Sequence, residues 1–126
     1  MKHDEYHLQK QVCNYLNWSY PEVLYMSDSI ASCKLTMVQA VRNKAIQKDG
    51  FKCPDIIILE PRGKYHGLFI ELKITTPFKK DGTIKKNEHL EGQLKTIDEL
   101  EAKGYSAFFA VGFDEAKFLI DRYLKN

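Results

Sequence analysis

The sequence predicts an α/β domain, and three observations point to this class. Apolar residues recur at helical spacing near both ends of the chain, over 4–18 and 89–103. Two short segments in the middle, 54–59 and 65–74, have the β-branched composition or the two-residue alternation of strands. The length of 126 residues, with 44% hydrophobic and 29% charged residues, suits one hydrophobic core. We therefore expect residues 1–126 to form a single domain.

The first two helices are expected at residues 4–18 and 37–48. In the first, apolar residues recur every three or four positions, and Asp4 is the expected N-terminal cap. A short strand over 23–26 is expected between the two helices. The apolar stripe of the second helix consists of Val38, Val41 and Ala45.

The two central strands are expected to pair as an antiparallel hairpin. Residues 54–59 form a short apolar run bounded by prolines, which is typical of a buried strand. Residues 65–74 alternate, so Glu71 and Lys73 share one face and the apolar residues share the other. A turn at Pro61-Arg62-Gly63 joins the two segments.

The last third of the chain predicts a loop, a helix, a strand and a helix. Residues 75–88 are rich in lysine, and Asp81-Gly82 predicts a turn, so we expect a basic loop or a small extra hairpin. A helix is expected over 89–103, a strand over 105–113, and a last helix capped by Asp114. The residues of this last helix that are expected to pack are Phe118, Leu119 and Tyr123.

Charge is distributed unevenly along the chain. From Lys34 to Lys95 there are 13 basic and 7 acidic residues, whereas the rest of the chain has 6 basic and 10 acidic residues. A basic middle suits a polyphosphate partner, because lysine and arginine contacts release counterions from the phosphates, and the alternative is a solvated surface. The candidate phosphate contacts are Arg42, Lys44, Lys48, Lys52, Lys79, Lys80, Lys85 and Lys86.

Membrane and disulfide-rich classes do not fit the sequence. No stretch approaches the roughly 20 apolar residues of a membrane span, and no signal peptide is evident, so we expect a cytoplasmic protein. The three cysteines are odd in number and contain no Cys-x-x-Cys pair. That pattern argues against both a disulfide framework and a thiolate zinc site.

A pair of carboxylates on the two central strands is the strongest candidate for chemistry. Asp55 enters one strand, and Glu71 lies on the next with Lys73 on the same face. Carboxylate oxygens suit a hard cation such as Mg²⁺, which also binds substrate phosphates. The Glu-x-Lys triplet occurs three times in the chain, so the alternative of a solvated sheet face stays open on spacing alone.

Two further polar residues lie on helix faces that are expected to be apolar. Glu5 falls on the same side of the first helix as Val12, and Gln93 lies in the stripe of Ile97. Burying a carboxylate or an amide costs several kcal/mol unless it is hydrogen-bonded, paired or bound to metal. The alternatives are a frayed first turn for Glu5 and a hydrogen-bonded core amide for Gln93. Together with the two carboxylates, both residues favour a site.

Four segments carry a resemblance to a known family. They are Glu5-x-x-Leu8-Gln9, Gly50 to Asp55, Gly67 to Lys73, and a helix that holds Gln93 and ends in Gly104-Tyr105. In order and spacing the chain resembles a PD-(D/E)XK nuclease, and more narrowly the stand-alone VRR-NUC nucleases of phages and bacteria. The resemblance implies a restriction-endonuclease-like αβββαβ core, with a central mixed sheet flanked by helices. An inserted helix at 37–48 fits this subfamily.

The resemblance implies an endodeoxyribonuclease that depends on Mg²⁺ or Mn²⁺. Asp55 and Glu71 would bind the metal, with the backbone carbonyl of Leu72 as a further ligand. Glu5 would complete the acidic cluster directly or through water.

The resemblance also assigns roles beyond the metal. Lys73 would orient the attacking water or stabilise the charged phosphorane, and Gln93 would position the site or the scissile phosphate. The chain departs from the pattern at Lys52 and Cys53, where such proteins often have small residues, and in the long segment 75–88. These departures concern substrate preference more than the chemistry.

The implied substrate is branched or nicked DNA, such as a four-way junction, a flap or a nick, in phage or bacterial replication, repair or recombination. A homodimer is also implied. Three alternatives remain: a catalytically inactive DNA-binding module with this fold, a restriction-type endonuclease, and a zinc site at His3 and His7, which are spaced one helical turn apart.

Overall fold

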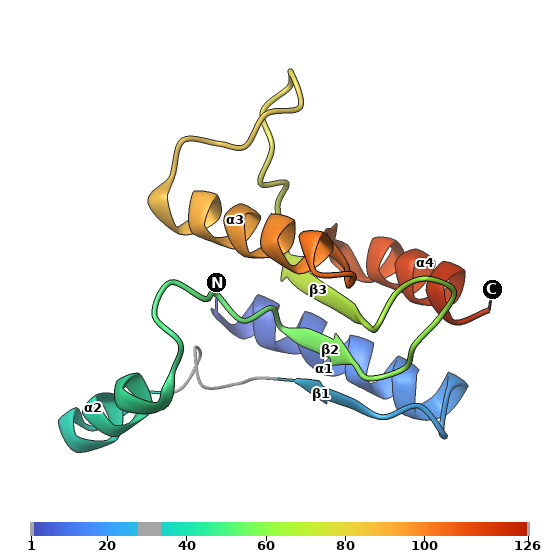
Figure 1. The fold of residues 1–126 in the computed structure, drawn as a ribbon, viewed down its shortest axis with the longest axis horizontal. Coiled ribbons are helices and arrows are strands. Elements are labelled where there is room, and N and C mark those ends of the chain that lie inside the picture. Colours follow the sequence, from blue (N-terminus) through green and yellow to red (C-terminus); the bar gives the residue numbers. More distant parts are fainter. Residues whose placement is uncertain (1, 28–33, 126) are drawn as a thin grey trace.

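The structure is a computed structural model that describes residues 2–27 and 34–125 (Figure 1). Within these residues one sheet has the strand order β1 (Tyr25–Ser27), β2 (Ile56–Ile58), β3 (Leu68–Lys73) and β4 (Ser106–Val111). β2 is antiparallel to both β1 and β3, and β4 is parallel to β3. The expected mixed sheet and its central antiparallel hairpin are confirmed.

Helices cover both faces of this sheet. α1 (Lys2–Ser19) and α4 (Gly112–Leu124) pack on one face, and α3 (Glu88–Ala102) packs on the other. α2 (Met37–Ile46) projects from the body of the molecule (Figure 1). α3 is also the crossover that two parallel neighbouring strands require, because it connects β3 to β4. No helix in the described ranges is both long enough and apolar enough to cross a membrane.

The sheet separates two hydrophobic clusters of unequal size. The larger lies between the sheet and α1 and α4, and Leu16, Ile70 and Ile120 are almost completely buried in it. The smaller is formed by α3 and β4 around Ile97 and Ala107. Since side chains alternate along a strand, the odd-numbered residues of β3 face α3.

Two expected helix caps are wrong. α1 begins at Lys2, which places Asp4 inside its first turn. α4 begins at Gly112, which follows β4 directly and leaves Asp114 inside the helix. Gly112 has a φ of 81°, and this left-handed conformation turns the chain from strand into helix; the N-cap residue, Val111, makes no side-chain capping hydrogen bond. The Glu115 side chain accepts a hydrogen bond from the Val111 N–H instead.

One expectation about packing is also wrong, and one apolar stripe is left uncovered. The apolar stripe of α2 is exposed: Val38 is 59% and Val41 63% accessible, and no α2 residue is buried. A capping box between Thr36 and Gln39 begins the helix, so local signals define its start although none of its residues is buried. In α4, Phe118 is exposed although it was expected to pack, whereas the other two expected residues are buried.

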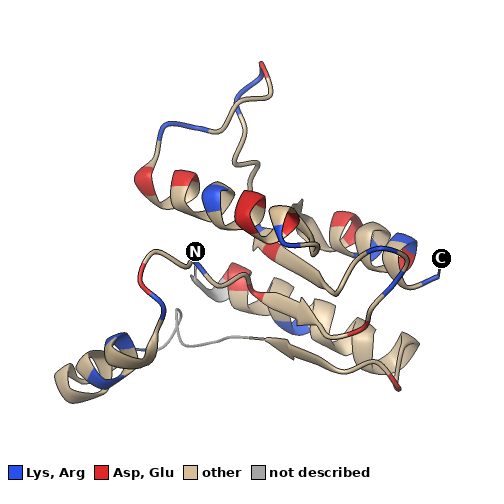
Figure 2. Ribbon diagram, in the orientation of Figure 1, with Lys and Arg blue, Asp and Glu red and all other residues tan. Residues whose placement is uncertain are grey.

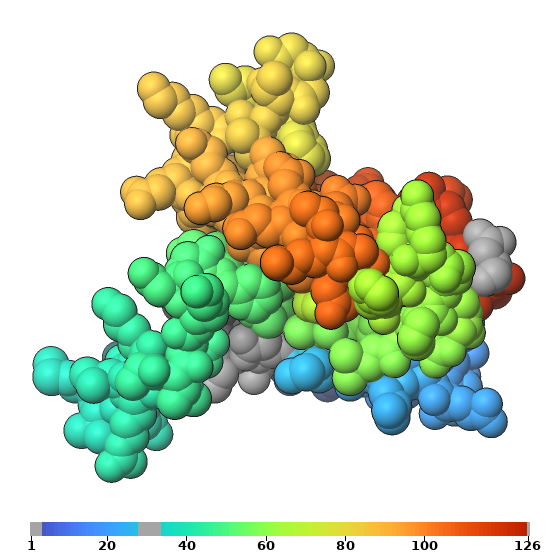
Figure 3. Space-filling model, viewed as in Figure 1, coloured from blue at the N-terminus to red at the C-terminus, as the bar shows by residue number. Residues whose placement is uncertain are grey.

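The lysine-rich segment before α3 forms a small irregular hairpin. Phe78 and Ile84 make one antiparallel bridge, and the N–H of Gly82 donates to the carbonyl of Lys79 at 2.9 Å. Gly82 has a φ of 88°, which suits glycine at the expected Asp81-Gly82 turn. The space-filling view shows this loop and α2 standing out from the body as two separate projections (Figure 3).

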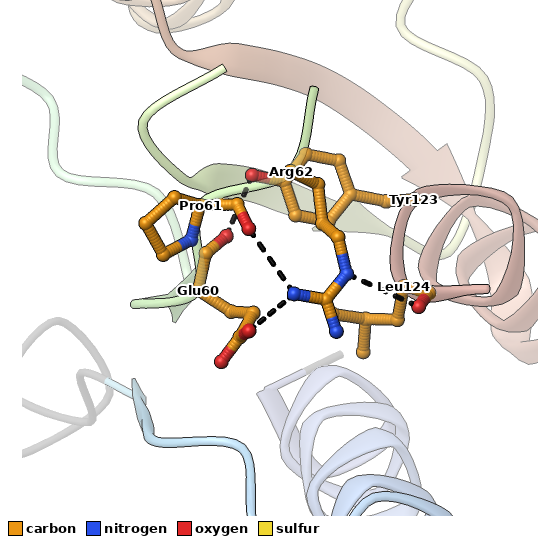
Figure 4. A network of polar contacts seen from close by, with 5 residues as sticks. All are labelled: Glu60, Pro61, Arg62, Tyr123 and Leu124. Carbon is orange, nitrogen blue, oxygen red and sulfur yellow. Dashed lines mark hydrogen bonds and ion pairs between the residues drawn. The ribbon is translucent and has the colours of Figure 1, made fainter. Parts of the chain in front are cut away.

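The C-terminal helix is tied to the β2–β3 turn by a polar network (Figure 4). The Arg62 guanidinium donates to the carbonyl of Leu124 and to that of Pro61, and pairs with the Glu60 carboxylate. The Tyr123 hydroxyl donates to the Glu60 carbonyl at 2.7 Å. This network lies where β2 ends and β3 begins, at the opposite end of the hairpin from Asp55 and Glu71.

Candidate active site

Asp55 and Glu71 meet at one end of the central hairpin. The register pairs Ile56 with Ile70, so the residue before β2 lies beside the residue that follows Ile70. Asp55 accepts a hydrogen bond from the N–H of Leu72 through Oδ2 at 2.8 Å, which fixes its carboxylate against β3. Glu71 is only 6% exposed. The structure therefore brings together the two carboxylates that the sequence singled out.

The environment of Glu71 favours its protonated form. Burial, followed by the charge of Asp55 and hydrogen bonding with it, raises the pKa of Glu71 to about 10, against an opposing effect of Lys73. In the metal-free protein at neutral pH, Glu71 is therefore a neutral acid beside Asp55. A bound cation would reverse this balance, because it favours the ionised form of any carboxylate that binds it.

Lys73 shares the α3-facing side of β3 with Glu71. Its charge lowers the pKa of Glu71, and its Nζ lies 6.0 Å from the centre of the Phe109 ring. The same ring makes an edge contact with Phe78, the residue at the base of the lysine-rich loop, with 5.6 Å between the ring centroids. Phe78 thus anchors that loop beside the site.

Gln93 is buried on α3 with an unpartnered oxygen. The side chain is 6% exposed, and its Oε1 has no hydrogen-bond partner among the described residues. An unpaired buried carbonyl of this kind costs about 1–3 kcal/mol. The alternative of a fully hydrogen-bonded core amide therefore does not describe Gln93, whose oxygen remains available to a ligand.

Glu5 lies near the acidic pair but is exposed, so its expected core-facing position is wrong. It belongs to the first turn of α1, and the first described core residue of that helix is Leu8, almost one turn later. Its charge nevertheless raises the pKa of Glu71 and of His89. The first turn of α1 therefore borders the site without being buried in it.

Sequence reasoning missed His89, which lies in the first turn of α3. Burial lowers the pKa of His89, as do the charges of Lys73 and Lys52, while Glu5 and Asp55 raise it. The carboxylates and the lysines of the site thus both act electrostatically on the His89 imidazole. A signal was present in the sequence, because His89 precedes Gln93 by four residues and so falls on the same side of the helix.

Sequence reasoning also missed a hydrogen-bonded chain behind Asp55. Gln9 on α1 donates through Nε2 to the Ser27 Oγ at 2.5 Å, and Ser27 donates to the carbonyl of Asp55 at 2.9 Å. This chain connects α1, β1 and the start of β2. It holds the backbone of Asp55, while the Leu72 N–H holds its side chain.

The candidate DNA contacts are dispersed over three segments. Figure 2 shows basic residues on α2 and along the lysine-rich loop. Lys52, one of the eight expected contacts, is bonded to α3: its backbone N–H donates to the Thr96 Oγ1 at 3.0 Å. All eight side chains are exposed, and none of them forms an ion pair with another described residue.

The donor set fits a hard divalent cation. Among the described side chains no three of His, Cys, Asp and Glu converge as a metal-binding group. Mg²⁺ needs no such group, because it keeps several waters and is usually held by one or two carboxylates together with substrate phosphates. Asp55, Glu71 and the Leu72 carbonyl offer oxygen donors of this kind. The side chain of His3 lies outside the described residues, so the zinc alternative stays a prediction.

Comparison with known proteins agrees with this fold. No protein-family model and no curated protein matches the chain. A solved structure described as a VRR_NUC domain protein is similar over 94% of this chain and 88% of that one, with 26% sequence identity and a TM-score of 0.58. The chain therefore has a VRR-NUC-like fold with a restriction-endonuclease-like α/β core, as the sequence predicted.

Proposed function

We propose that this protein is an endodeoxyribonuclease that hydrolyses phosphodiester bonds with Mg²⁺ or Mn²⁺. The observation that carries the proposal is the contact between Asp55 and the buried Glu71, two carboxyl groups held together at one end of a sheet. Such a pair is costly in a fold that does not use it. The similarity to a VRR_NUC domain protein supports a nuclease-type function.

Each residue of the site has a role in this proposal. Asp55, Glu71 and the Leu72 carbonyl would hold the cation, which lowers the pKa of a water and neutralises charge on the phosphate. Lys73 places an ammonium on the same face, where it stabilises the charge that develops on the phosphoryl oxygens. Gln93 offers an unpaired oxygen that can accept a hydrogen bond from the attacking water.

DNA structure is the proposed basis of selectivity, with a four-way junction, a flap or a nick as the preferred substrate. The basic residues lie on α2, on the lysine-rich loop and before β2, which are separate segments of the fold (Figure 2). Contacts of lysine and arginine with phosphates position a protein on DNA without reading its sequence. Basic residues on separate segments can contact phosphates of DNA strands that diverge from one another, as they do in a junction or a flap.

A cleavage assay tests the proposal. Supercoiled plasmid and a synthetic four-way junction are incubated with the parent protein in Mg²⁺, Mn²⁺ or EDTA. The variants are Asp55→Ala and, as a matched control, Asp98→Ala, which removes an exposed aspartate from α3. We expect metal-dependent cutting by the parent and the control, and at least a hundredfold slower cutting by Asp55→Ala, as for loss of an essential electrostatic group.

Two results would overturn the proposal. DNA binding without cutting in either metal would indicate a non-catalytic binding module. Equal cutting by Asp55→Ala would show that the activity does not arise at this site. Cutting at one fixed sequence would replace structure selectivity with a restriction-type activity.

We also propose that the active form is a homodimer, as the sequence resemblance implies. The exposed apolar stripe of α2 is a surface that association would cover. Sedimentation velocity over a range of protein concentrations tests this part separately, and a monomer at every concentration would contradict it.

A further inference from the structure

Lys52 is fixed along α3 at two points. Its backbone N–H donates to the hydroxyl of Thr96, which is itself only 1% exposed. Its side chain crosses the helix at Gly92: a methyl group at that position would lie 3.3 Å from Cε, 3.5 Å from Cγ and 3.9 Å from Cδ of Lys52. The aliphatic part of Lys52 therefore occupies the space that a larger residue 92 would fill.

Gly92 has no other evident reason to be glycine. Gly92 lies inside a regular α-helix and does not have a positive φ. In this it differs from Gly104, which follows the C-cap of α3 and has a positive φ. Glycine inside a helix lowers helix stability relative to alanine. The property that glycine supplies here is the absence of a side chain, and Lys52 uses the resulting space.

The charged end of Lys52 belongs to the surroundings of the acidic pair. Its charge acts on His89, which precedes Gly92 by three residues on α3. Lys73, Glu5 and Asp55 act on the same imidazole. Lys52 therefore adds a cation at the α3 side of the site, and no described carboxylate forms an ion pair with it.

We propose that Lys52 is a phosphate-binding residue of this site with an ordered side chain. Gly92 is its positioning residue, because the absence of a side chain at Gly92 leaves the space in which the aliphatic part of Lys52 packs. The inference rests on the proposed function, because it takes DNA as the ligand. A lysine whose stem is already ordered loses less conformational entropy when it binds a phosphate than an extended surface lysine does. Lys52 should therefore contribute more to DNA affinity than any single lysine of the loop.

Equilibrium binding in EDTA tests the inference without requiring cleavage. The probes are a fluorescent four-way junction and a plain duplex, titrated at several salt concentrations. Lys52→Ala should weaken binding roughly tenfold and reduce the slope of log affinity against log salt by about 1, as for the loss of one phosphate contact. The matched control is Lys95→Ala, which removes a lysine from α3 beside Asp98 and Glu99, and its effect should be smaller.

Substitution of Gly92 tests the packing of the Lys52 side chain against α3. Gly92→Leu places a side chain where the stem of Lys52 lies, so it should weaken binding as much as Lys52→Ala does. The double variant should be no weaker than either single variant, because both remove the same contact. Gly92→Ala should have a smaller effect in the same direction, since one methyl group displaces the lysine by only a few tenths of an ångström.

A loss of fold would not give this pattern. Thermal unfolding of Gly92→Ala and Gly92→Leu should occur at or above the parent temperature, because alanine and leucine favour helices more than glycine does. Ala102→Leu, at an exposed position of α3, controls for the added side chain and should leave binding unchanged. In metal-free protein, NMR titration should show a higher pKa for His89 in Lys52→Ala, because the Lys52 charge lowers it.

The outcomes separate this inference from the proposed function. A parent protein that binds neither probe would overturn the proposed function. A parent that binds DNA while Lys52→Ala keeps the same affinity and salt slope would overturn only the inference. If Lys52→Ala weakens binding but the effects of Gly92→Leu and Lys52→Ala simply add, Gly92 is not the positioning residue.

Discussion

At the scale of one residue, the raised pKa of Glu71 makes the folding stability of the metal-free protein depend on pH. Its pKa is raised from 4.5 to about 10 by burial and by Asp55, so between these values the folded state binds a proton that the unfolded state has lost. Folding stability must then fall as pH rises through this range, by at most about 1.4 kcal/mol per pH unit from this group. The acidic pair therefore destabilises the metal-free protein at neutral pH.

Replacing Glu71 by glutamine should remove this pH dependence. Glu71→Gln keeps the shape of the protonated acid, so the metal-free variant should be more stable than the parent at pH 7, by as much as about 3 kcal/mol. The difference should disappear well below pH 4.5, where Glu71 of the parent is protonated in both the folded and the unfolded state. Urea unfolding at several pH values measures it, with Glu99→Gln on the exposed surface of α3 as the control. A constant difference at all pH values would contradict the raised pKa.

Gln93 presents the same conflict between stability and function. Because its buried Oε1 lacks a partner, Gln93→Leu should raise the free energy of unfolding by about 1 kcal/mol. The variant should also cut DNA at least tenfold more slowly, because the proposed contact with the attacking water is lost. Denaturant unfolding and single-turnover cleavage measure the two effects. Full activity in Gln93→Leu would show that the free oxygen has no catalytic use.

The sequence revealed some of these residues and not others, for a physical reason. Asp55 and Glu71 interrupt apolar strand patterns, and the pairing of adjacent strands is a local consequence of a short turn, so their meeting could be predicted. The contact between Lys52 and Gly92 joins residues 40 positions apart in the chain and leaves no periodic signal. Glu5 shows the converse case, because periodicity placed it on the buried face although α1 is not yet buried at that turn.

At the scale of elements, periodicity predicted where helices and strands form better than it predicted what covers them. α3 was expected over 89–103 and occupies Glu88–Ala102. The parallel pairing of β3 and β4 could not be read from either strand, since it depends on the route of α3 across the sheet. α2 has the spacing of an amphipathic helix, yet no described element buries its apolar stripe.

This difference between α2 and the other helices predicts a difference in local stability. A helix of ten residues is marginal in water without tertiary contacts, and α2 has no buried residue. In the monomer its backbone amides should therefore exchange with deuterium at least a hundredfold faster than those at the centre of α3 or α4. Hydrogen-exchange mass spectrometry over a range of protein concentrations measures this.

Two outcomes of the exchange experiment are informative. Protection of α2 that increases with protein concentration would support a dimer that covers its apolar stripe. Strong protection at the lowest concentration, in a protein shown to be monomeric, would contradict the marginal stability of this helix.

At the scale of the whole molecule, the ends of the central hairpin differ in how their polar groups are satisfied. The end that carries Asp55 and Glu71 has a raised carboxyl pKa, and the buried Gln93 on α3 has an unpaired amide oxygen. At the other end, the Arg62 guanidinium is paired with Glu60 and capped by two backbone carbonyls (Figure 4). Asp121 on α4 is similarly satisfied, because it accepts two tyrosine hydroxyls and pairs with Lys117. Polar groups therefore stabilise the fold away from the candidate site, whereas the buried side chains of Glu71 and Gln93 destabilise it.

This separation predicts opposite effects of substitutions at the two ends. Arg62→Ala removes a charged hydrogen bond to the last turn of α4 and should lower the free energy of unfolding by about 1–2 kcal/mol. DNA affinity and the cleavage rate should stay within a factor of two at a temperature where both proteins are folded, because Arg62 lies beyond the opposite end of β2 from Asp55. Lys64→Ala, which removes an exposed lysine from the same turn, controls for net charge. If Arg62→Ala instead weakened DNA binding as much as Lys52→Ala, the turn would belong to the DNA surface and the two ends would share one function.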